Sequence, residues 1–418
     1  MRTHTTRFAI ACLLTLTIAL SSHAADSDIG PNDWPWWRGP DTNGIASPDQ
    51  SPPSSWGSSN AIWKVAIPGR GHGSPTVVGD HVYLATADHD RNVQSIHCFD
   101  RNSGKTLWVS DVHKGGIMSG NKKASQASST VACDGERIYA NFVNGGAVYT
   151  TALDRSGKKL WQTKISKYKI HQGYGSSPAI YKSLVLVSAD NKLGGAIAAL
   201  NQQTGKIVWR VNRPKKPNYP SPVVVNAAGR EQLIMTGCDV VSSFNPLTGK
   251  KLWEVEGATT ECVTTTVTNG DLVYTSGGYP KNHVAAMKAD GSGEIVWWNS
   301  TRVYVPSMVC HNGYLYAVSD AGAAICWDAA TGKEQWKNRL GRGFTASPVM
   351  VGDRFYAISE RGETFVYSAN PKSFKLISQG QLGNQAYATP TICGGRIYQR
   401  VAVMTDSGRQ EMLYCIGE

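Results

Sequence analysis

Aromatic and basic side chains recur in this sequence at one position, a few residues before each of a series of short segments that begin with Ser, Thr or Pro. Such side chains could bind an anionic, planar or sugar-like ligand, or a peptide, if the fold gathered them around one opening. The alternative is that the rings only fill that opening and cover the strand ends. The candidates are His72, Lys122, Lys123, His171, Tyr174, Tyr219, Tyr304, Phe344 and Tyr387, with Glu261 at the corresponding point.

Motifs for catalysis or metal binding are not found in the sequence. The glycine-rich residues 69–73 precede a strand-like segment instead of a helix, which excludes a dinucleotide-binding loop. There is no G-x-S-x-G elbow, no H-E-x-x-H zinc motif and no C-x-x-C-H haem motif. The ten histidines lack the spacing of metal ligands. We therefore predict no catalytic residue and no metal site.

An internal repeat must position the candidate side chains, because they lie tens of residues apart. Its clearest element is a D-x-x-T-G-K turn followed by a short segment that ends on Trp. Asp or Asn binds backbone N–H groups in such a turn, and Gly supplies the positive φ of a tight hairpin. We expect each Trp to be buried between neighbouring units. The predicted structural tryptophans are Trp63, Trp108, Trp161, Trp209, Trp253, Trp297 and Trp336.

The repeat units predict an all-β fold, an eight-bladed β-propeller of four-stranded antiparallel blades. The eighth unit ends at residues 414–418 without a Trp segment, whereas residues 61–68 carry a Trp segment with no turn before it. We therefore expect the N-terminal strand to complete the last blade and close the ring. Seven blades are the alternative, because residues 368–374 replace the turn and Trp of the seventh unit.

The chain divides into a signal peptide at residues 1–24, an irregular Trp- and Pro-rich arm at 25–59 and the propeller at 60–418. The leader has Arg2 and Arg7 before an apolar run, and a small-x-small cleavage site follows the run. We expect a cleaved signal peptide, export to a periplasm or to the outside of the cell, and no membrane span. An uncleaved anchor is the alternative, although the apolar run is short for one.

The arm carries three tryptophans in four residues, Trp34, Trp36 and Trp37. Rings this dense are not expected to stay solvated. We expect the arm to dock onto the propeller, and a patch for a partner is the alternative.

The formal net charge is +11. A strongly basic protein can bind nucleic acid, but here the basic residues are scattered one or two per turn, as on a solvated rim. Export also argues against nucleic acid. We expect a monomer whose partner is a protein or a small anionic or sugar-like ligand.

Eight cysteines remain after the leader. Six fall on two repeat positions and are expected to be small buried side chains, because equivalent positions point the same way in every unit. Cys238 and Cys262 break this pattern and are a candidate disulfide.

The repeat resembles that of the PQQ-like propellers, the quinoprotein-alcohol-dehydrogenase-like fold, whose units end in the same D-x-x-T-G-K-x-x-W element. The resemblance covers residues 60–418 and implies the propeller fold. Segments 34–40, 69–75 and 167–178 are similar to those of exported bacterial members. Function stays open, because the same blades occur in quinoprotein dehydrogenases and in the non-enzymatic outer-membrane assembly propeller BamB.

The resemblance also implies what a dehydrogenase of this kind would need. Quinoprotein dehydrogenases hold the quinone against a disulfide between adjacent cysteines, and no Cys-Cys pair occurs here. Their calcium ligands and Asp base match no positions of this sequence. We therefore predict an exported, non-catalytic binding or scaffold module for protein or small-molecule ligands, with no cofactor. The alternatives are a divergent quinone-dependent oxidoreductase that uses PQQ and calcium, and a carbohydrate-binding propeller.

Overall fold

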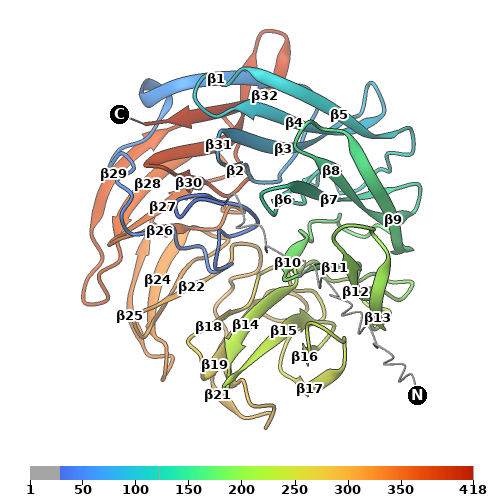
Figure 1. The fold of residues 1–418 in the computed structure, drawn as a ribbon. Coiled ribbons are helices and arrows are strands. Elements are labelled where there is room, and N and C mark those ends of the chain that lie inside the picture. Colours follow the sequence, from blue (N-terminus) through green and yellow to red (C-terminus); the bar gives the residue numbers. More distant parts are fainter. Residues whose placement is uncertain (1–28, 122, 418) are drawn as a thin grey trace, which may run out of the picture.

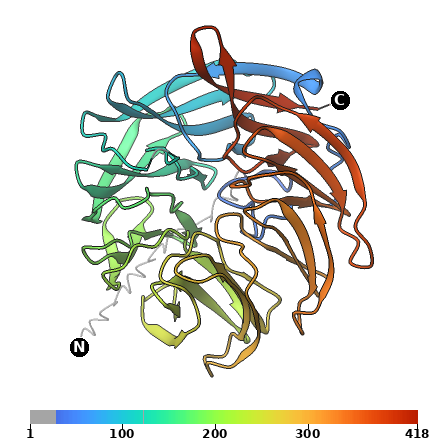
Figure 2. The ribbon, with the colours of Figure 1, turned by 180° about the vertical axis from the view of Figure 1, so that it is seen from behind.

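Eight four-stranded antiparallel sheets form a ring around a central axis (Figure 1). The computed structural model describes residues 29–121 and 123–417, so the predicted signal peptide at 1–24 and the candidate Lys122 lie outside the described residues. The predicted eight-bladed propeller is confirmed, and the alternative of seven blades is wrong. Figure 2 shows the same ring from behind.

The blades follow one another along the chain, and the first strand of each lies nearest the axis (Figure 1). A short 3-10 helix, η1 (Ser58–Asn60), precedes the first strand. Blades 1 to 4 consist of β2 (Thr76–Val78), β3 (His81–Asp88), β4 (Val93–Asp100), β5 (Thr106–Lys114); β6 (Ala132–Cys133), β7 (Arg137–Asn144), β8 (Ala147–Asp154), β9 (Lys159–Lys167); β10 (Ala179–Tyr181), β11 (Leu184–Ser188), β12 (Ala196–Asn201), β13 (Ile207–Asn212); and β14 (Val223–Ala227), β15 (Arg230–Gly237), β16 (Val240–Phe244), β17 (Lys251–Glu256). Blades 5 to 8 consist of β18 (Val267–Thr268), β19 (Leu272–Gly277), β20 (His283–Lys288), β21 (Ile295–Asn299); β22 (Val309–His311), β23 (Tyr314–Val318), β24 (Ala323–Asp328), β25 (Glu334–Arg339); β26 (Val349–Val351), β27 (Arg354–Ile358), β28 (Glu363–Ser368), β29 (Leu376–Gln381); and β30 (Thr391–Cys393), β31 (Arg396–Thr405), β32 (Gly408–Ile416), β1 (Ala61–Ile67).

The two ends of the propeller meet in blade 8. Strand β1 pairs antiparallel with β32, and Trp63 lies opposite Cys415 in this pairing. The N-terminal strand is thus the outermost strand of the last blade, as the sequence predicts. This pairing closes the ring without leaving an open edge between the first and last units.

The tryptophan on an outer strand fastens its blade to the next blade. Trp297 Nε1 donates to the carbonyl oxygen of Ala329 (2.9 Å). Its ring also fills the space beside Gly332, where φ is +71° and an added Cβ would lie 2.5 Å from Trp297 Cδ2. Glycine is required there for its positive φ and for its missing side chain. The same contact joins Trp63 to Gly104, Trp108 to Gly157, Trp161 to Gly205, Trp209 to Gly249 and Trp253 to Gly291.

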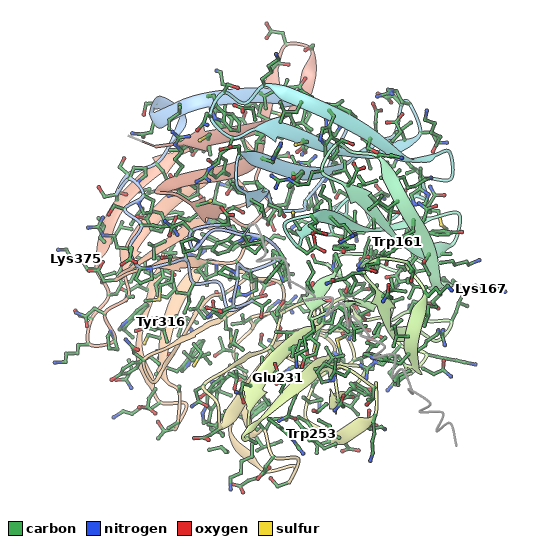
Figure 3. The ribbon with its side chains drawn as sticks, viewed as in Figure 1. Trp161, Lys167, Glu231, Trp253, Tyr316 and Lys375 are labelled. Atoms are coloured by element: carbon green, nitrogen blue, oxygen red, sulfur yellow. The ribbon has the colours of Figure 1, made fainter. Side chains whose placement is uncertain are left out.

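Blade 7 keeps this contact although its turn has diverged. Trp336 Nε1 donates to the carbonyl oxygen of Asn370 (2.9 Å), and the ring of Phe374 lies 5.5 Å from that of Trp336. Two tryptophans of regular blades, Trp161 and Trp253, are labelled on their outer strands in Figure 3. The apolar core accordingly lies between neighbouring sheets; Cys98 of blade 1, for example, packs in one cluster with Cys133 of blade 2.

The arm crosses the centre of the ring, where it forms the blue loops in Figure 1. Trp34 is 1% exposed and exchanges backbone hydrogen bonds with Val77 of blade 1 (2.9 and 3.0 Å). Trp37 Nε1 donates to Thr265 Oγ1 before blade 5 (2.8 Å). The amide N–H of Ala46 donates to the carbonyl oxygen of Met350 in blade 7 (2.8 Å). The arm therefore docks onto its own propeller.

Arg38 of the arm is buried, and no carboxylate pairs with it among the described residues. Its guanidinium donates to the carbonyl oxygens of Asn43 and Met308, which ties the arm to blade 6. Burial lowers the pKa of Arg38 to about 9, because the apolar surroundings disfavour its charged form.

All eight cysteines after the leader are free thiols, which corrects the candidate disulfide between Cys238 and Cys262. Cys238 has a φ of +61°, and its Sγ lies 3.8 Å from Asp190 Oδ2. Cys262 Sγ lies instead near the carbonyl oxygen of Thr259 (3.7 Å). Five of the six cysteines on repeat positions are buried, and Cys310 is partly exposed. No helix in the described part of the chain is long and apolar enough to cross a membrane.

Candidate functional site

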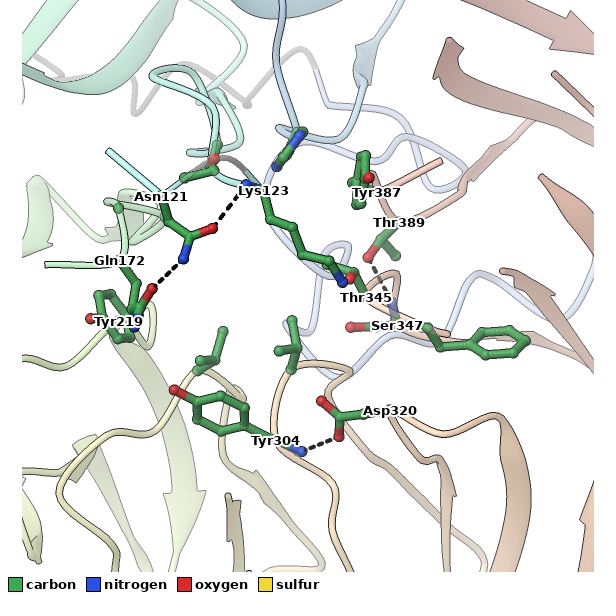
Figure 4. A pocket seen from close by; sticks show the side chains of 18 of the residues that line it. Asn121, Lys123, Gln172, Tyr219, Tyr304, Asp320, Thr345, Ser347, Tyr387 and Thr389 are labelled. Atoms are coloured by element: carbon green, nitrogen blue, oxygen red, sulfur yellow. Dashed lines mark hydrogen bonds between the residues drawn. The ribbon is translucent and has the colours of Figure 1, made fainter. Parts of the chain in front are cut away.

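A cavity of about 610 Å³ lies at the centre of the ring, where the loops before the inner strands gather (Figure 4). Trp37 of the arm also borders it. The structure places seven of the predicted residues around this cavity: His72, Lys123, Tyr174, Tyr219, Tyr304, Phe344 and Tyr387. Their role in binding stays a prediction, but their convergence on one space is a finding.

Aromatic rings form much of the cavity wall. The rings of His72 and Tyr387 lie 4.5 Å apart at an angle of 32°. Phe344 is 1% exposed and packs into the wall between blades 6 and 7. Tyr174 differs, because its hydroxyl donates to the carbonyl oxygen of Ser188 (2.9 Å) and so covers a strand end. The expectation that rings cover strand ends therefore describes Tyr174.

A hydroxyl-bearing residue opens each inner strand and links neighbouring blades. The backbone N–H of Ser347 donates to Thr389 Oγ1 (3.0 Å), and that of Ser177 donates to Ser221 Oγ (2.9 Å). Because each hydroxyl accepts in such a bond, its own hydrogen stays available to donate. Among the described residues, six bonds of this kind run from Ser74 to Thr130, Thr130 to Ser177, Ser177 to Ser221, Thr265 to Ser307, Ser307 to Ser347 and Ser347 to Thr389.

The charged side chains that line the cavity are two basic and two acidic residues. Lys123 Nζ lies 2.9 Å from Glu360 Oε2, so this ion pair reaches across the mouth from the loop before blade 2 to blade 7. Arg302 and Asp320 are the other two. The backbone N–H of Tyr304 donates to Asp320 Oδ2 (2.7 Å), while burial raises the pKa of Asp320. The lining thus has no excess of either sign.

Two polar atoms of lining residues, His72 Nε2 and the hydroxyl oxygen of Tyr219, lack a hydrogen-bond partner among the described residues. Burial, and then the charges of neighbouring arginines, holds the pKa of His72 well below its usual range, so the imidazole is neutral at pH 7. Burial raises the pKa of Tyr219, so its hydroxyl stays protonated. Buried polar atoms usually find a partner, and these two are free to bind a polar group of a ligand.

His171 lies beside the cavity instead of lining it. Its Nε2 is 3.2 Å from Glu261 Oε1, and the hydroxyl of Tyr304 donates to Glu261 Oε2 (3.2 Å). Burial, and then the charge of Glu261, raises the pKa of Tyr304. Three of the residues singled out in the sequence therefore form one hydrogen-bonded cluster behind the wall.

Sequence reasoning missed lining residues in the turn between the second and third strands of a blade. Asp320 follows β23 and Glu360 follows β27, and both line the cavity. Each stands in a Ser-acid-x-Gly segment, at 319–322 and 359–362, which is a signal the sequence does carry. Trp37 was expected to dock onto the body, but its place at the cavity was not foreseen.

A second candidate site is the outer edge of blade 5. Strand β21 reads Ile-Val-Trp-Trp-Asn and carries no charge, whereas the outermost strands of six other blades carry charged residues. Ile295, Val296 and Trp298 are 46%, 39% and 55% exposed. Strand β29 of blade 7 is also uncharged, but the arm lies against it, and Ser378 Oγ donates to the carbonyl oxygen of Ser54 (2.5 Å).

The residues around the cavity do not fit a calcium-bound planar tricarboxylate such as PQQ. Calcium needs several clustered oxygen ligands. No three His, Cys, Asp or Glu side chains in the part of the chain that the structure describes lie close enough together to hold a metal. Of the two cations, Lys123 is paired with Glu360, and Arg302 donates to Gly278 and Asn282. The two cations of the lining are balanced by Asp320 and Glu360, so the lining offers no net positive charge to three carboxylates.

The fold and the repeat define the class: an eight-bladed propeller of PQQ-like units whose central cavity is bordered by its own N-terminal arm. A family model described as outer membrane protein assembly factor BamB matches residues 57–173, 92–338 and 280–371. The chain belongs to this family. The predicted resemblance to PQQ-like propellers is thereby confirmed.

The similar proteins include, by name, both an assembly factor and a dehydrogenase. Outer membrane protein assembly factor BamB of Moranella endobia (strain PCIT) is 25% identical over 336 residues, which are 77% of this chain and 81% of that protein. The crystal structure of BamB from Moraxella catarrhalis has a TM-score of 0.60 and 14% identity, and the match covers 85% of this chain and 97% of that one. Quinohemoprotein alcohol dehydrogenase from Comamonas testosteroni has a TM-score of 0.66 and 14% identity, over 93% and 81%. These two structures show the fold alone.

Proposed function

We propose that this chain is an exported, non-catalytic propeller that binds another protein. The uncharged, exposed edge of β21 carries the proposal. One side of β21 pairs with β20, and no strand pairs with its other side among the described residues. An exposed apolar strand edge is a template for a further strand, and native proteins usually protect such edges with charges.

The occupant is an extended segment of a partner protein that adds to β21 as a fifth strand of blade 5. Backbone hydrogen bonds would supply affinity in this mode, and pockets for alternate side chains would supply specificity. Trp298 is the anchor, because a large exposed aromatic ring gains most from burial at an interface. Membership of a family described as an outer membrane protein assembly factor supports a role in protein binding.

Site-specific photo-crosslinking tests the proposal. A photo-reactive amino acid replaces Ile295 in the chain expressed in its exporting host. The matched control carries the same amino acid at Lys337 on the charged edge of blade 6. We expect an adduct with another protein at Ile295 only, and its loss when Trp298→Lys is added.

Two results would count against this function. Equal adducts at Ile295 and Lys337, or none at either, would mean that the edge of β21 is not a binding site. An adduct whose mass is twice that of the chain would mean that β21 pairs two copies of this protein.

Export depends on the predicted leader. N-terminal sequencing of the exported protein tests cleavage of this leader directly, because a chain that still begins at Met1 would contradict cleavage.

A further inference from the structure

We propose that the central cavity binds a neutral carbohydrate. This site is separate from the edge of β21 and does not depend on the function proposed for that edge. Its volume of about 610 Å³ lies within the roughly 300–1,000 Å³ of cavities that enclose small ligands. Three properties of the lining select the ligand: its hydrogen-bonding groups, its ring faces and its charge.

The hydrogen-bonding groups of the lining favour a ligand that both donates and accepts hydrogen bonds. Four of the hydroxyls that accept the bonds between neighbouring blades also line the cavity, namely those of Ser177, Ser221, Ser347 and Thr389. Among the described residues no acceptor for the hydrogens of these four hydroxyls is present. The carboxylates of Asp320 and Glu360 line the same space as acceptors. A sugar hydroxyl can both accept from the first group and donate to the second. An ionised carboxylate group has no hydrogen to donate, and in this cavity it would be repelled by the carboxylates of Asp320 and Glu360.

Two further groups would be satisfied by sugar hydroxyls. His72 Nε2 and the hydroxyl of Tyr219 lack partners among the described residues, although Tyr219 is only 9% exposed. Because the imidazole is neutral, Nε2 can accept or donate according to its tautomer. A ligand with hydroxyls around its whole rim meets such scattered groups, whereas an apolar ligand would leave them all unsatisfied.

The rings supply faces against which the apolar side of a sugar ring can pack. Trp37 borders the cavity from the arm, and its indole N–H is already bonded to Thr265, which fixes the ring in place. The rings of Tyr387 and His72 pack against one another in a tilted arrangement at the wall, and Tyr304 lies across the cavity from Tyr387 in Figure 4. Aromatic residues combine a large apolar face with a polar tip, which suits a ligand with polar edges and C–H faces.

The charges favour a neutral ligand over an anionic one. The two basic side chains of the lining face two acidic ones, and Lys123 and Glu360 are paired directly. An anionic ligand would have to break this pair or approach Asp320. A neutral ligand leaves the pair in place across the mouth, where it limits the exit of the ligand.

A glycan array that holds neutral and acidic glycans, followed by calorimetry with cellotriose, maltotriose, xylotriose and the anionic trigalacturonate, tests the proposal on the purified full chain. PQQ serves as the planar tricarboxylate. We expect binding to at least one neutral glycan and to neither trigalacturonate nor PQQ. Tyr387→Ala is expected to weaken this binding about 3- to 10-fold, which corresponds to the worth of one aromatic contact. Leu107→Ala, on the outer strand of blade 1, is the control and should leave it unchanged.

A second variant keeps the test informative if Tyr387→Ala fails to fold. Glu360→Gln preserves the shape of the side chain but leaves the charge of Lys123 unpaired. It should retain the neutral glycan within about 3-fold and bind trigalacturonate about 5- to 30-fold more tightly than the parent protein does, because the unpaired positive charge of Lys123 attracts an anion. Binding to no glycan, binding by the parent protein to trigalacturonate or PQQ alone, or equal losses for Tyr387→Ala and Leu107→Ala would each overturn the proposal.

Discussion

The contact between the tryptophan of one blade and the turn glycine of the next can be tested with two glycines that share a backbone conformation. Gly332 has a φ of +71°, and an added Cβ would lie 2.5 Å from Trp297 Cδ2. Gly229 has a φ of +72°, and nothing lies within 4 Å of an added Cβ. Replacement by alanine therefore imposes the same backbone cost at both positions, and only Gly332→Ala adds a clash with the neighbouring blade.

The expected magnitudes follow from these contacts. A positive φ costs an alanine about 1–2 kcal/mol, and the lower entropy of the unfolded chain offsets about 0.4–1 kcal/mol of this. Gly229→Ala should thus lower the free energy of unfolding by about 1 kcal/mol. The clash with Trp297 adds about 1–3 kcal/mol, the usual cost of overpacking, so Gly332→Ala should lower it by about 2–4 kcal/mol.

Urea unfolding, followed by tryptophan fluorescence and far-ultraviolet circular dichroism, measures both variants against the parent protein. A double-mutant cycle with Trp297→Leu isolates the contact itself. The smaller leucine should make room for the methyl group, so the double variant should be more stable than the sum of the single effects implies. Equal losses for Gly332→Ala and Gly229→Ala, with no coupling to Trp297, would refute the inference that this ring fastens blade 5 to blade 6.

Three further predictions concern buried groups. Burial lowers the pKa of His97 and His283 to about 4, so both stay neutral in the folded state, whereas the unfolded chain binds protons below about pH 6.5. The free energy of unfolding should therefore fall as the pH falls from about 6.5 to 4, by up to ~1.4 kcal/mol per pH unit for each histidine. Urea titrations at several pH values measure this change. Asp190→Ala leaves the almost fully buried Arg213, whose Nε lies 3.3 Å from Asp190 Oδ1, without its ion-pair partner and should cost about 3–5 kcal/mol by the same assay. Trp34→Ala empties the site of a side chain that is 1% exposed and should cost about 3–5 kcal/mol, with faster proteolysis of the arm.

Each of these predictions has a control within the chain. A free energy of unfolding that does not change between about pH 6.5 and 4 would contradict neutral, buried histidines. Glu294→Ala breaks the exposed pair with Lys288 and should change stability far less than Asp190→Ala, because solvent screens this pair; an equal loss would remove the argument from burial. Trp298→Ala should change stability by about 0.5 kcal/mol or less, and a similar effect of Trp34→Ala would mean that the arm does not hold to the ring.

The ring itself could be predicted because its rules are local. The turn motif specifies a hairpin through Asp and Gly, and the Trp that follows has only the next unit to pack against. The segment that carries Trp63 has no turn of its own, and the last blade lacks an outer strand, so this segment could be predicted to pair with β32, where Trp63 lies opposite Cys415. Even the diverged turn of blade 7 follows the rule, since Trp336 still bonds to the carbonyl of Asn370.

The cavity could be predicted only in part, because the contacts between its lining residues depend on closure of the ring. Lys123 and Glu360 are 237 residues apart and meet only because the blades return to their start. Trp37 and Thr265 are 228 residues apart, and no local rule gives the path of the arm. The predicted disulfide was wrong for a local reason. Cys238 and Cys262 lie near one another in the sequence, but the positive φ of Cys238 directs its thiol toward Asp190.

The pairing of β1 with β32 also determines when the molecule can be finished. Residues 61–67 are synthesised before the other strands of the ring, yet their partner, β32, is the last strand of the ring to be made. At about 5–20 residues per second, roughly half a minute passes between the two, and during this time the first strand has an open edge. The ring therefore cannot close until the chain has been synthesised through β32, so its last blade is necessarily the last to be completed.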